Sequence, residues 1–189
     1  MKAWRIAIAG ALCLILAACV TPDRIGGSGR ADEFSRVGRF ALTVTEPDGK
    51  QDAVQGGFSW LDEGDRYVLD LTNPLGSTQA RVEGTARGAT LTRANGEVLQ
   101  ADDPDALAEE ALGSPVPVSG MRDWLRGRTA RQPVATQLQS DAQNRPTSFQ
   151  QGGWQANLSR YDEQGPQLLV LERRVDGRRV VVRLVVNAP

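Results

Sequence analysis

The stretch YVLDLTNPLGSTQARVE, residues 67–83, decides the fold of this chain. Apolar and polar residues alternate on both sides of its centre, which predicts two β-strands. Asn73, Pro74 and Gly76 are typical of tight turns, so the strands are expected to form an antiparallel hairpin. Leu75 stands between the proline and the glycine, where a hairpin is most exposed, and an apolar side chain there needs an explanation.

The same alternation continues along most of the chain. It is clear at Phe40 to Val44, at Phe58 to Trp60, at Trp154 to Leu158 and at Arg178 to Val186. Turn sequences such as EPDGK (46–50) separate neighbouring segments. The pattern predicts a mainly β (α+β) fold, an antiparallel meander of roughly ten short strands.

Two short helices are expected to interrupt the strands. Asp103 can cap the first, Pro104 suits its first position, and Gly113 ends it. Ser119 is expected to cap the second helix, and Gly127 to stop it. The residues that these helices turn inward are apolar: Leu107, Ala108, Ala111, Met121, Trp124 and Leu125.

A curled sheet with an apolar inner face needs a cover, and these two helices can supply it. Sheet and helices could pack as a solid core. Alternatively, they could enclose a gap that holds an apolar ligand. The alternation alone favours the solid core.

The N-terminal residues have the order of an export signal. Lys2 and Arg5 precede an apolar run, and LAAC (16–19) resembles the bacterial lipobox. We therefore expect residues 1–18 to be a lipoprotein signal peptide, and Cys19 to become the lipidated first residue of the mature protein.

The next segment, 19–33, is rich in glycine, polar and charged residues, and it is expected to be a flexible tether. Val20 follows the cysteine, where an aspartate retains many Gram-negative lipoproteins at the inner membrane. By resemblance to these lipoproteins, the absence of an aspartate at position 20 implies a lipid anchor in the outer membrane, with the protein facing the periplasm. Residues 34–189 are expected to form one domain.

Composition excludes several classes of function. The 189 residues contain no histidine, which rules out Ser-His-Asp and Cys-His catalysis and His-ligated zinc. Loss of Lys2 and Arg5 with the signal lowers the 22 basic residues to 20, against 23 acidic ones, and a net charge of −3 gives no support for nucleic-acid binding. We expect no enzyme activity, no cofactor and no metal.

Several motifs together resemble the LolB family. They are GRFAL (38–42), GGFSW (56–60), YVLDLTNPLGST (67–78), ADDPDALAEEALGSPVPVSGMRDWLRG (101–127) and GGW (152–154) with Tyr161. The resemblance implies an outer-membrane lipoprotein that receives other lipoproteins from the periplasmic carrier LolA. It also implies an unclosed antiparallel β-barrel of about ten or eleven strands, with helices as a lid over an apolar cavity for acyl chains. We expect a monomer.

The resemblance gives the inward residues a role as the wall of this cavity. The candidates are Phe40, Leu42, Phe58, Trp60, Tyr67, Leu69, Leu71, Leu107, Met121, Trp124, Leu125 and Trp154, and later strands add Leu158, Leu169, Leu171, Val182 and Leu184. Leu75, held between Pro74 and Gly76, is expected to protrude as a membrane-insertion loop that delivers cargo to outer-membrane lipid. Two alternatives remain: a half-barrel that binds another amphiphile, and a solid-core structural lipoprotein for envelope assembly.

Overall fold

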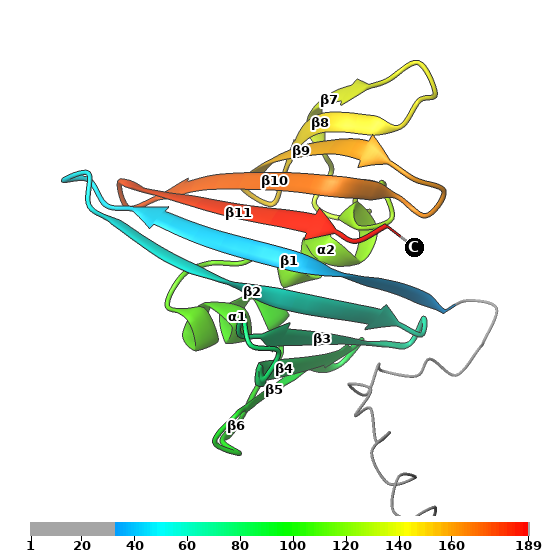
Figure 1. The fold of residues 1–189 in the computed structure, drawn as a ribbon. Helices are drawn as coiled ribbons and strands as arrows, with labels where there is room; N and C mark the ends of the chain where they lie inside the picture. Colours follow the sequence, from blue (N-terminus) through cyan, green and yellow to red (C-terminus); the bar gives the residue numbers. More distant parts are fainter. Residues whose placement is uncertain (1–32, 189) are drawn as a thin grey trace, which may run out of the picture.

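The computed structural model describes residues 33–188 (Figure 1). The predicted signal peptide, Cys19 and most of the predicted tether lie outside these residues. The strands are β1 (Phe34–Thr45), β2 (Gln51–Asp62), β3 (Arg66–Thr72), β4 (Thr78–Thr85), β5 (Gly88–Arg93), β6 (Val98–Ala101), β7 (Thr136–Ser140), β8 (Pro146–Gln151), β9 (Trp154–Tyr161), β10 (Pro166–Val175) and β11 (Arg178–Val186). The helices are α1 (Pro104–Leu112) and α2 (Val118–Trp124).

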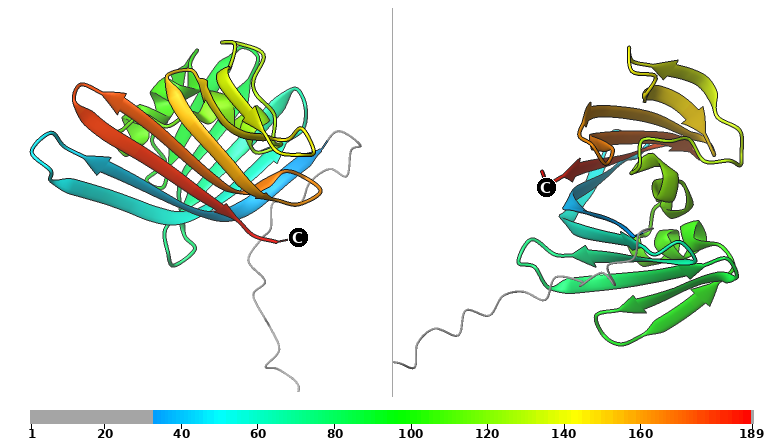
Figure 2. Two further views of the ribbon diagram at one scale, coloured as in Figure 1. Left: turned by 90° about the horizontal axis from the view of Figure 1, so that it is seen from above. Right: turned by 90° about the vertical axis from the view of Figure 1, so that its right-hand side faces the viewer.

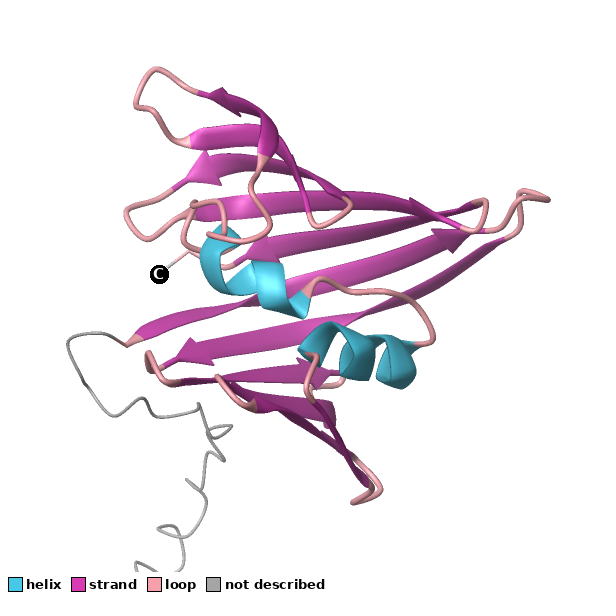
Figure 3. Ribbon diagram, turned by 180° about the vertical axis from the view of Figure 1, so that it is seen from behind, coloured by secondary structure: helices cyan, strands magenta, loops and turns pink. Residues whose placement is uncertain are grey.

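All strands belong to one antiparallel sheet that does not close. The order is β6-β5-β4-β3-β2-β1-β11-β10-β9-β8-β7, so β6 and β7 are free edges among the described residues. The first and last strands pair at the centre, with Phe40 opposite Leu184 and Leu42 opposite Val182. The sheet curls strongly, and both helices lie inside the curve (Figures 2 and 3). The predicted unclosed antiparallel barrel of ten or eleven strands is therefore confirmed.

Residues that alternate in the sequence lie on opposite faces of this sheet, the apolar ones on the buried inner face. In β1, every second residue from Phe34 to Val44 is buried, and the residues between them are exposed or half-buried. The same alternation holds in β2 from Gly56 to Trp60, where Phe58 and Trp60 face inward, and it ends at Leu61 and Asp62, which are both buried. The first half of β2 is exposed, and with β1 it forms a long hairpin that extends past the helices (Figure 1).

Helix α1 begins and ends as the sequence predicts. Asp103 is the N-cap, and its side chain accepts a hydrogen bond of 2.9 Å from the N–H of Asp105. Gly113 follows the helix with a φ of 69°, in the left-handed region that glycine adopts without strain. Its N–H donates to the carbonyl of Glu109 at 2.7 Å, which satisfies one of the last free carbonyls of the helix.

Helix α2 corrects one prediction, because Ser119 does not cap it. Pro117 occupies the cap position, and its carbonyl accepts the N–H of Met121 at 3.1 Å, so the helix starts two residues earlier than predicted. Ser119 lies in the first turn, where it donates to Asp105 instead. The helix ends at Trp124, and Gly127, with a φ of 70°, ends the turn that follows.

Candidate functional site

An entirely apolar cavity lies between the inner face of the sheet and the two helices. The cavity measures about 30 Å³ in this conformation. Its walls are Phe40, Leu42, Phe58, Trp60, Leu69, Leu71, Val82, Leu91, Ala108, Ala111, Leu112, Val116, Val118, Met121, Leu125, Val182 and Leu184. Among residues 33–188 no charged side chain lines it and its lining surface is apolar, so the cavity offers a ligand no charge and no exposed polar group.

Most of the residues predicted for the cavity wall are found there. The structure brings together Phe40, Leu42, Phe58, Trp60, Leu69, Leu71, Met121 and Leu125, and of the later-strand candidates it adds Val182 and Leu184. Five further residues line the cavity although they were not predicted to: Val82, Leu91, Leu112, Val116 and Val118. The alternation in β4 and β5 could have identified Val82 and Leu91, because both lie on the buried face of their strands.

Seven predicted wall residues lie in the surrounding core instead, because they are buried but do not line the cavity: Tyr67, Leu107, Trp124, Trp154, Leu158, Leu169 and Leu171. Tyr67 stacks against Trp60 with ring centroids 4.8 Å apart. Trp124 makes an edge contact with Phe149 at 5.7 Å, and its indole N–H donates to Gln151 at 2.8 Å. Tyr67 and Trp124 therefore pack against residues beside the cavity. The aromatic residues that line the cavity are Phe40, Phe58 and Trp60, and the other lining side chains are not aromatic.

The C-terminal part of α2 is anchored to one half of the sheet by ion pairs. Asp62, 1% exposed at the end of β2, accepts two hydrogen bonds of 2.9 Å from Arg122 and one of 3.1 Å from Arg126. Burial alone would raise the pKa of Asp62, but the bonds from Arg122, the Gly64 N–H and Arg126 hold that pKa below its ordinary value. The carboxylate therefore stays charged and keeps the helix in place.

The same helix is also anchored to the other half of the sheet, through β8. Gln151 is 4% exposed. Its side-chain oxygen accepts the indole N–H of Trp124 and the N–H of Ala130, and its amide donates to the carbonyls of Ala130 and Pro133. Helix α2 and the turn after it are therefore hydrogen-bonded to β2 in one half of the sheet and to β8 in the other, and they connect the two halves across the curve.

Helix α1 is held by fewer polar contacts. The Ser119 N–H and hydroxyl donate to Asp105 at 2.7 and 2.8 Å, and Arg93 donates to the carbonyl of Glu110 at 3.2 Å. Burial raises the pKa of Asp105, an effect that the two bonds from Ser119 oppose. Otherwise α1 rests on β4, β5 and β6 through its apolar face, with Leu107 and Ala108 buried.

The β3–β4 loop forms the second feature of the site. Leu75 at its tip is 92% exposed. The side-chain oxygen of Asn73 accepts the N–H of Leu75 at 2.9 Å and that of Ser77 at 3.0 Å, and Gly76, with a φ of 89°, donates to the Asn73 carbonyl at 2.9 Å. The loop is therefore stiff, and it projects from the outer face of the sheet, opposite the helices (Figure 2).

These features define a class of protein. They are a curled, unclosed antiparallel sheet, two helices inside its curve and an apolar cavity between them. The chain belongs to the LolB family: the family model described as "Outer membrane lipoprotein LolB" matches residues 32–188. Membership of this family supports a role in lipoprotein localisation. No helix among residues 33–188 is long and apolar enough to cross a membrane.

Comparison with curated proteins gives the same family. The outer-membrane lipoprotein LolB of Bordetella petrii is 65% identical over 190 residues, which cover 99% of this chain and 95% of the relative. The LolB of Cupriavidus metallidurans is 38% identical over 192 residues and covers 93% of each chain. Among solved structures, the LolA superfamily protein NE2245 from Nitrosomonas europaea matches with a TM-score of 0.44 and 14% identity, over 85% of this chain and 90% of that one.

Proposed function

We propose that this chain is a lipid-anchored acceptor in the outer membrane, facing the periplasm. It takes lipoproteins from a LolA-like periplasmic carrier, holds their acyl chains in the apolar cavity and inserts them into the outer membrane. Cys19 carries the anchor, and the domain acts as a monomer. The observation that carries the proposal is the wholly apolar cavity under the helical lid, in a chain of the LolB family.

The physical need for such a cavity follows from the cargo. Each methylene group transferred from water to an apolar site gains about 0.8 kcal/mol, so acyl chains released into water would lose tens of kcal/mol. A site without polar groups can replace the bilayer during transfer. Movement from carrier to acceptor to bilayer then requires only that affinity rises at each step, about 1.4 kcal/mol for each tenfold preference.

The cavity must expand before it can hold an acyl chain. Its volume of about 30 Å³ admits a few water-sized molecules, whereas ligand pockets usually measure about 300–1,000 Å³. Helix α2 is anchored to both halves of the sheet through Asp62 and Gln151, whereas α1 rests mainly on apolar contacts. We therefore assign the opening movement to α1, which carries the wall residues Ala108, Ala111 and Leu112.

Delivery uses the β3–β4 loop in this proposal. Leu75 is almost fully exposed on a loop that Asn73 stiffens, so its side chain can enter a membrane interface without any rearrangement of the fold. Burial of one leucine side chain there contributes about 1.5–3 kcal/mol. Pro74 and Gly76 set the turn that holds Leu75 outward.

A fluorescent apolar probe tests the cavity directly. We expect a naphthalene-type fluorophore to bind the folded domain, and Ala111→Phe, which places a large side chain in the cavity wall, to weaken that binding about tenfold, or about 1.4 kcal/mol. Ala94→Phe, the same change in the exposed β5–β6 turn, is the control and should bind like the unmodified chain. Absence of binding to a folded domain would contradict the proposal and favour a solid-core structural lipoprotein.

A second titration separates lipoprotein transfer from the binding of another amphiphile. A triacylated lipopeptide should displace the probe, and the same peptide without its acyl chains should not. If small detergents displace the probe and the lipopeptide does not, the cavity serves a different amphiphile.

A further inference from the structure

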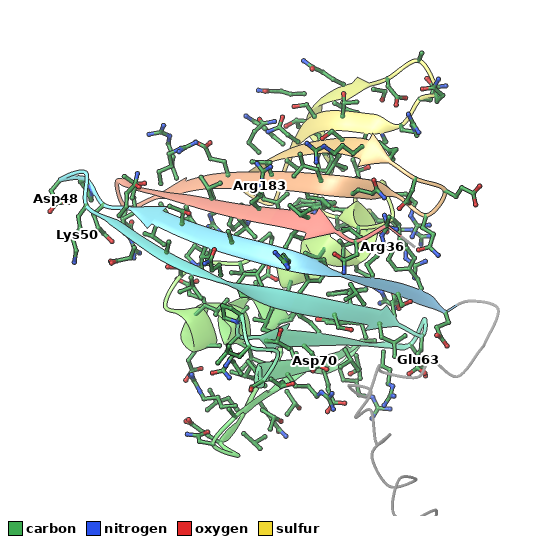
Figure 4. All side chains as sticks on the ribbon, in the orientation of Figure 1. Arg36, Asp48, Lys50, Glu63, Asp70 and Arg183 are labelled. Carbon is green, nitrogen blue, oxygen red and sulfur yellow. The ribbon has the colours of Figure 1, made fainter. Side chains whose placement is uncertain are left out.

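A hollow of about 530 Å³ lies on the outer face of the sheet, beside the projecting β3–β4 loop. Asn73, Pro74 and Gly76 of that loop form one wall, and Arg39 and Arg183 also line the hollow. Figure 4 shows Arg183 on the outer side of the sheet, away from the helices. The hollow is separate from the apolar cavity, which lies on the inner face.

Gly57 keeps this part of the surface open. A Cβ added to Gly57 would lie 2.5 Å from the hydroxyl of Thr72, so no side chain fits between the two strands there. At Gly57 the floor of the hollow is therefore backbone, and a ligand can reach the sheet itself there.

The two arginines are close enough to share one ligand. Arg39 pairs with Val185 across β1 and β11, and Arg183 pairs with Ala41, so the arginines lie on the same face in neighbouring strands, two residues apart in register. Such diagonal neighbours are about 7–8 Å apart, well within the reach of two long side chains that converge on one group.

Both arginines lack a partner among the described residues. Arg39 and Arg183 are exposed and make no hydrogen bond or ion pair within residues 33–188. Other arginines on this face are neutralised: Arg81 pairs with Asp70 at 2.6 Å, and Arg179 with Glu172 at 2.6 Å. Among residues 33–188 no aspartate or glutamate lines the hollow, so these residues do not compensate its positive charge locally.

We propose that this hollow binds the phosphate of an anionic phospholipid headgroup. Guanidinium groups match phosphate oxygens in geometry and charge. The exposed Leu75 lies on the adjoining loop, next to the two arginines. In this arrangement the arginines can contact a lipid headgroup while Leu75 enters the acyl region below it. The inference deepens the proposed delivery step, because it gives the loop a second contact that orients it on the membrane.

Vesicle binding tests the proposal. The protein is the chain 19–189 with Cys19→Ser, which contains every described residue and lacks only the lipid. Affinity is measured by co-sedimentation with phosphatidylcholine vesicles with and without phosphatidylglycerol, for Arg39→Gln/Arg183→Gln and for a control, Arg87→Gln/Arg131→Gln. The control removes the same charge from exposed arginines that do not line the hollow.

We expect the Arg39/Arg183 variant to bind phosphatidylglycerol vesicles about twenty- to thirty-fold more weakly, about fivefold for each arginine near an anionic surface. The control should change less than threefold, and neither variant should alter binding to phosphatidylcholine alone. Equal losses in both variants would overturn the proposal in favour of diffuse charge attraction, and so would no loss in either.

Two further arms complete the test. Inorganic phosphate at constant ionic strength should not displace the vesicles, because the site is proposed for a membrane-bound headgroup; displacement would identify a free-phosphate site and overturn the assignment to lipid. Leu75→Glu, measured in parallel, separates the two proposals. If it leaves vesicle binding unchanged while the arginine variant weakens it, the headgroup site stands and the loop proposal fails.

Discussion

The substitution Leu75→Glu separates a membrane-insertion loop from a structural hairpin. Leu75 is 92% exposed, and the hydrogen bonds of its loop come from the backbone and from Asn73, none of which the substitution removes. Exposed substitutions of this kind change the free energy of unfolding by no more than about 0.5 kcal/mol. The urea midpoint and the affinity for an apolar probe should therefore stay nearly constant.

Membrane contact should change far more. If the leucine is buried at the interface, its loss removes about 1.5–3 kcal/mol, which is one to two orders of magnitude in affinity. The added carboxylate also has to be desolvated, so this figure is a lower bound. We expect delivery of a bound lipoprotein to liposomes to fall at least tenfold.

The assay loads the chain with a labelled lipoprotein and follows transfer of the label to sedimented liposomes. Leu138→Glu is the matched control, because Leu138 in β7 is also exposed, at 53%, and lies outside the β3–β4 loop. Unchanged delivery by Leu75→Glu would refute a role in insertion. A fall in urea midpoint and in probe affinity together would show that Leu75 is part of the folded core.

Three further predictions concern the fold that supports the site. Asp62→Asn should lower the free energy of unfolding by about 2–3 kcal/mol at pH 7, because it weakens the buried contacts to Arg122 and Arg126. Since the pKa of Asp62 lies below its ordinary value of 3.8 in the fold, its contribution is complete above that value and is lost as pH falls through the folded pKa. Urea titrations at pH 7 and pH 3 should therefore show the variant and the unmodified chain converging in acid; a constant difference would exclude charge as the cause. Tyr67→Phe should leave the urea midpoint unchanged or raise it slightly, because the Tyr67 hydroxyl is buried without a hydrogen-bond partner among residues 33–188; a clear fall would reveal a partner for it. Gly76→Ala should cost about 1 kcal/mol in thermal or urea unfolding, because a φ of 89° strains any side chain even though the space is open; no loss would mean that the turn relaxes.

The strands could be predicted from the sequence wherever one face is buried. In β1, alternating apolar residues became the buried face as expected, whereas in β3 four successive residues, Tyr67 to Asp70, are buried. The region 128–150 offered no such signal, because every residue of β7 is exposed and its pairing with β8 is irregular. An edge strand without a buried face leaves no periodic trace in the sequence.

The candidate site could be predicted in composition but not in detail. Met121 and Trp124 lie on the same inward side of one helix, yet Met121 lines the cavity and Trp124 packs beside it. Which of two apolar side chains meets a gap depends on the packing of neighbouring elements, which hydrophobic spacing does not record. The start of α2 was missed for a related reason, since Ser119 found a partner in α1 rather than in its own helix.

Transfer of cargo from a carrier tests the central claim most directly. The chain 19–189 with Cys19→Ser is mixed with a LolA-like carrier loaded with a lipoprotein, and pull-down of each protein shows which one holds the cargo. We predict that the lipoprotein moves to this chain, and that it does so without the lipid anchor, because the cavity lies within residues 33–188. Cargo that stays on the carrier, with this chain shown to be folded by circular dichroism, would contradict the account.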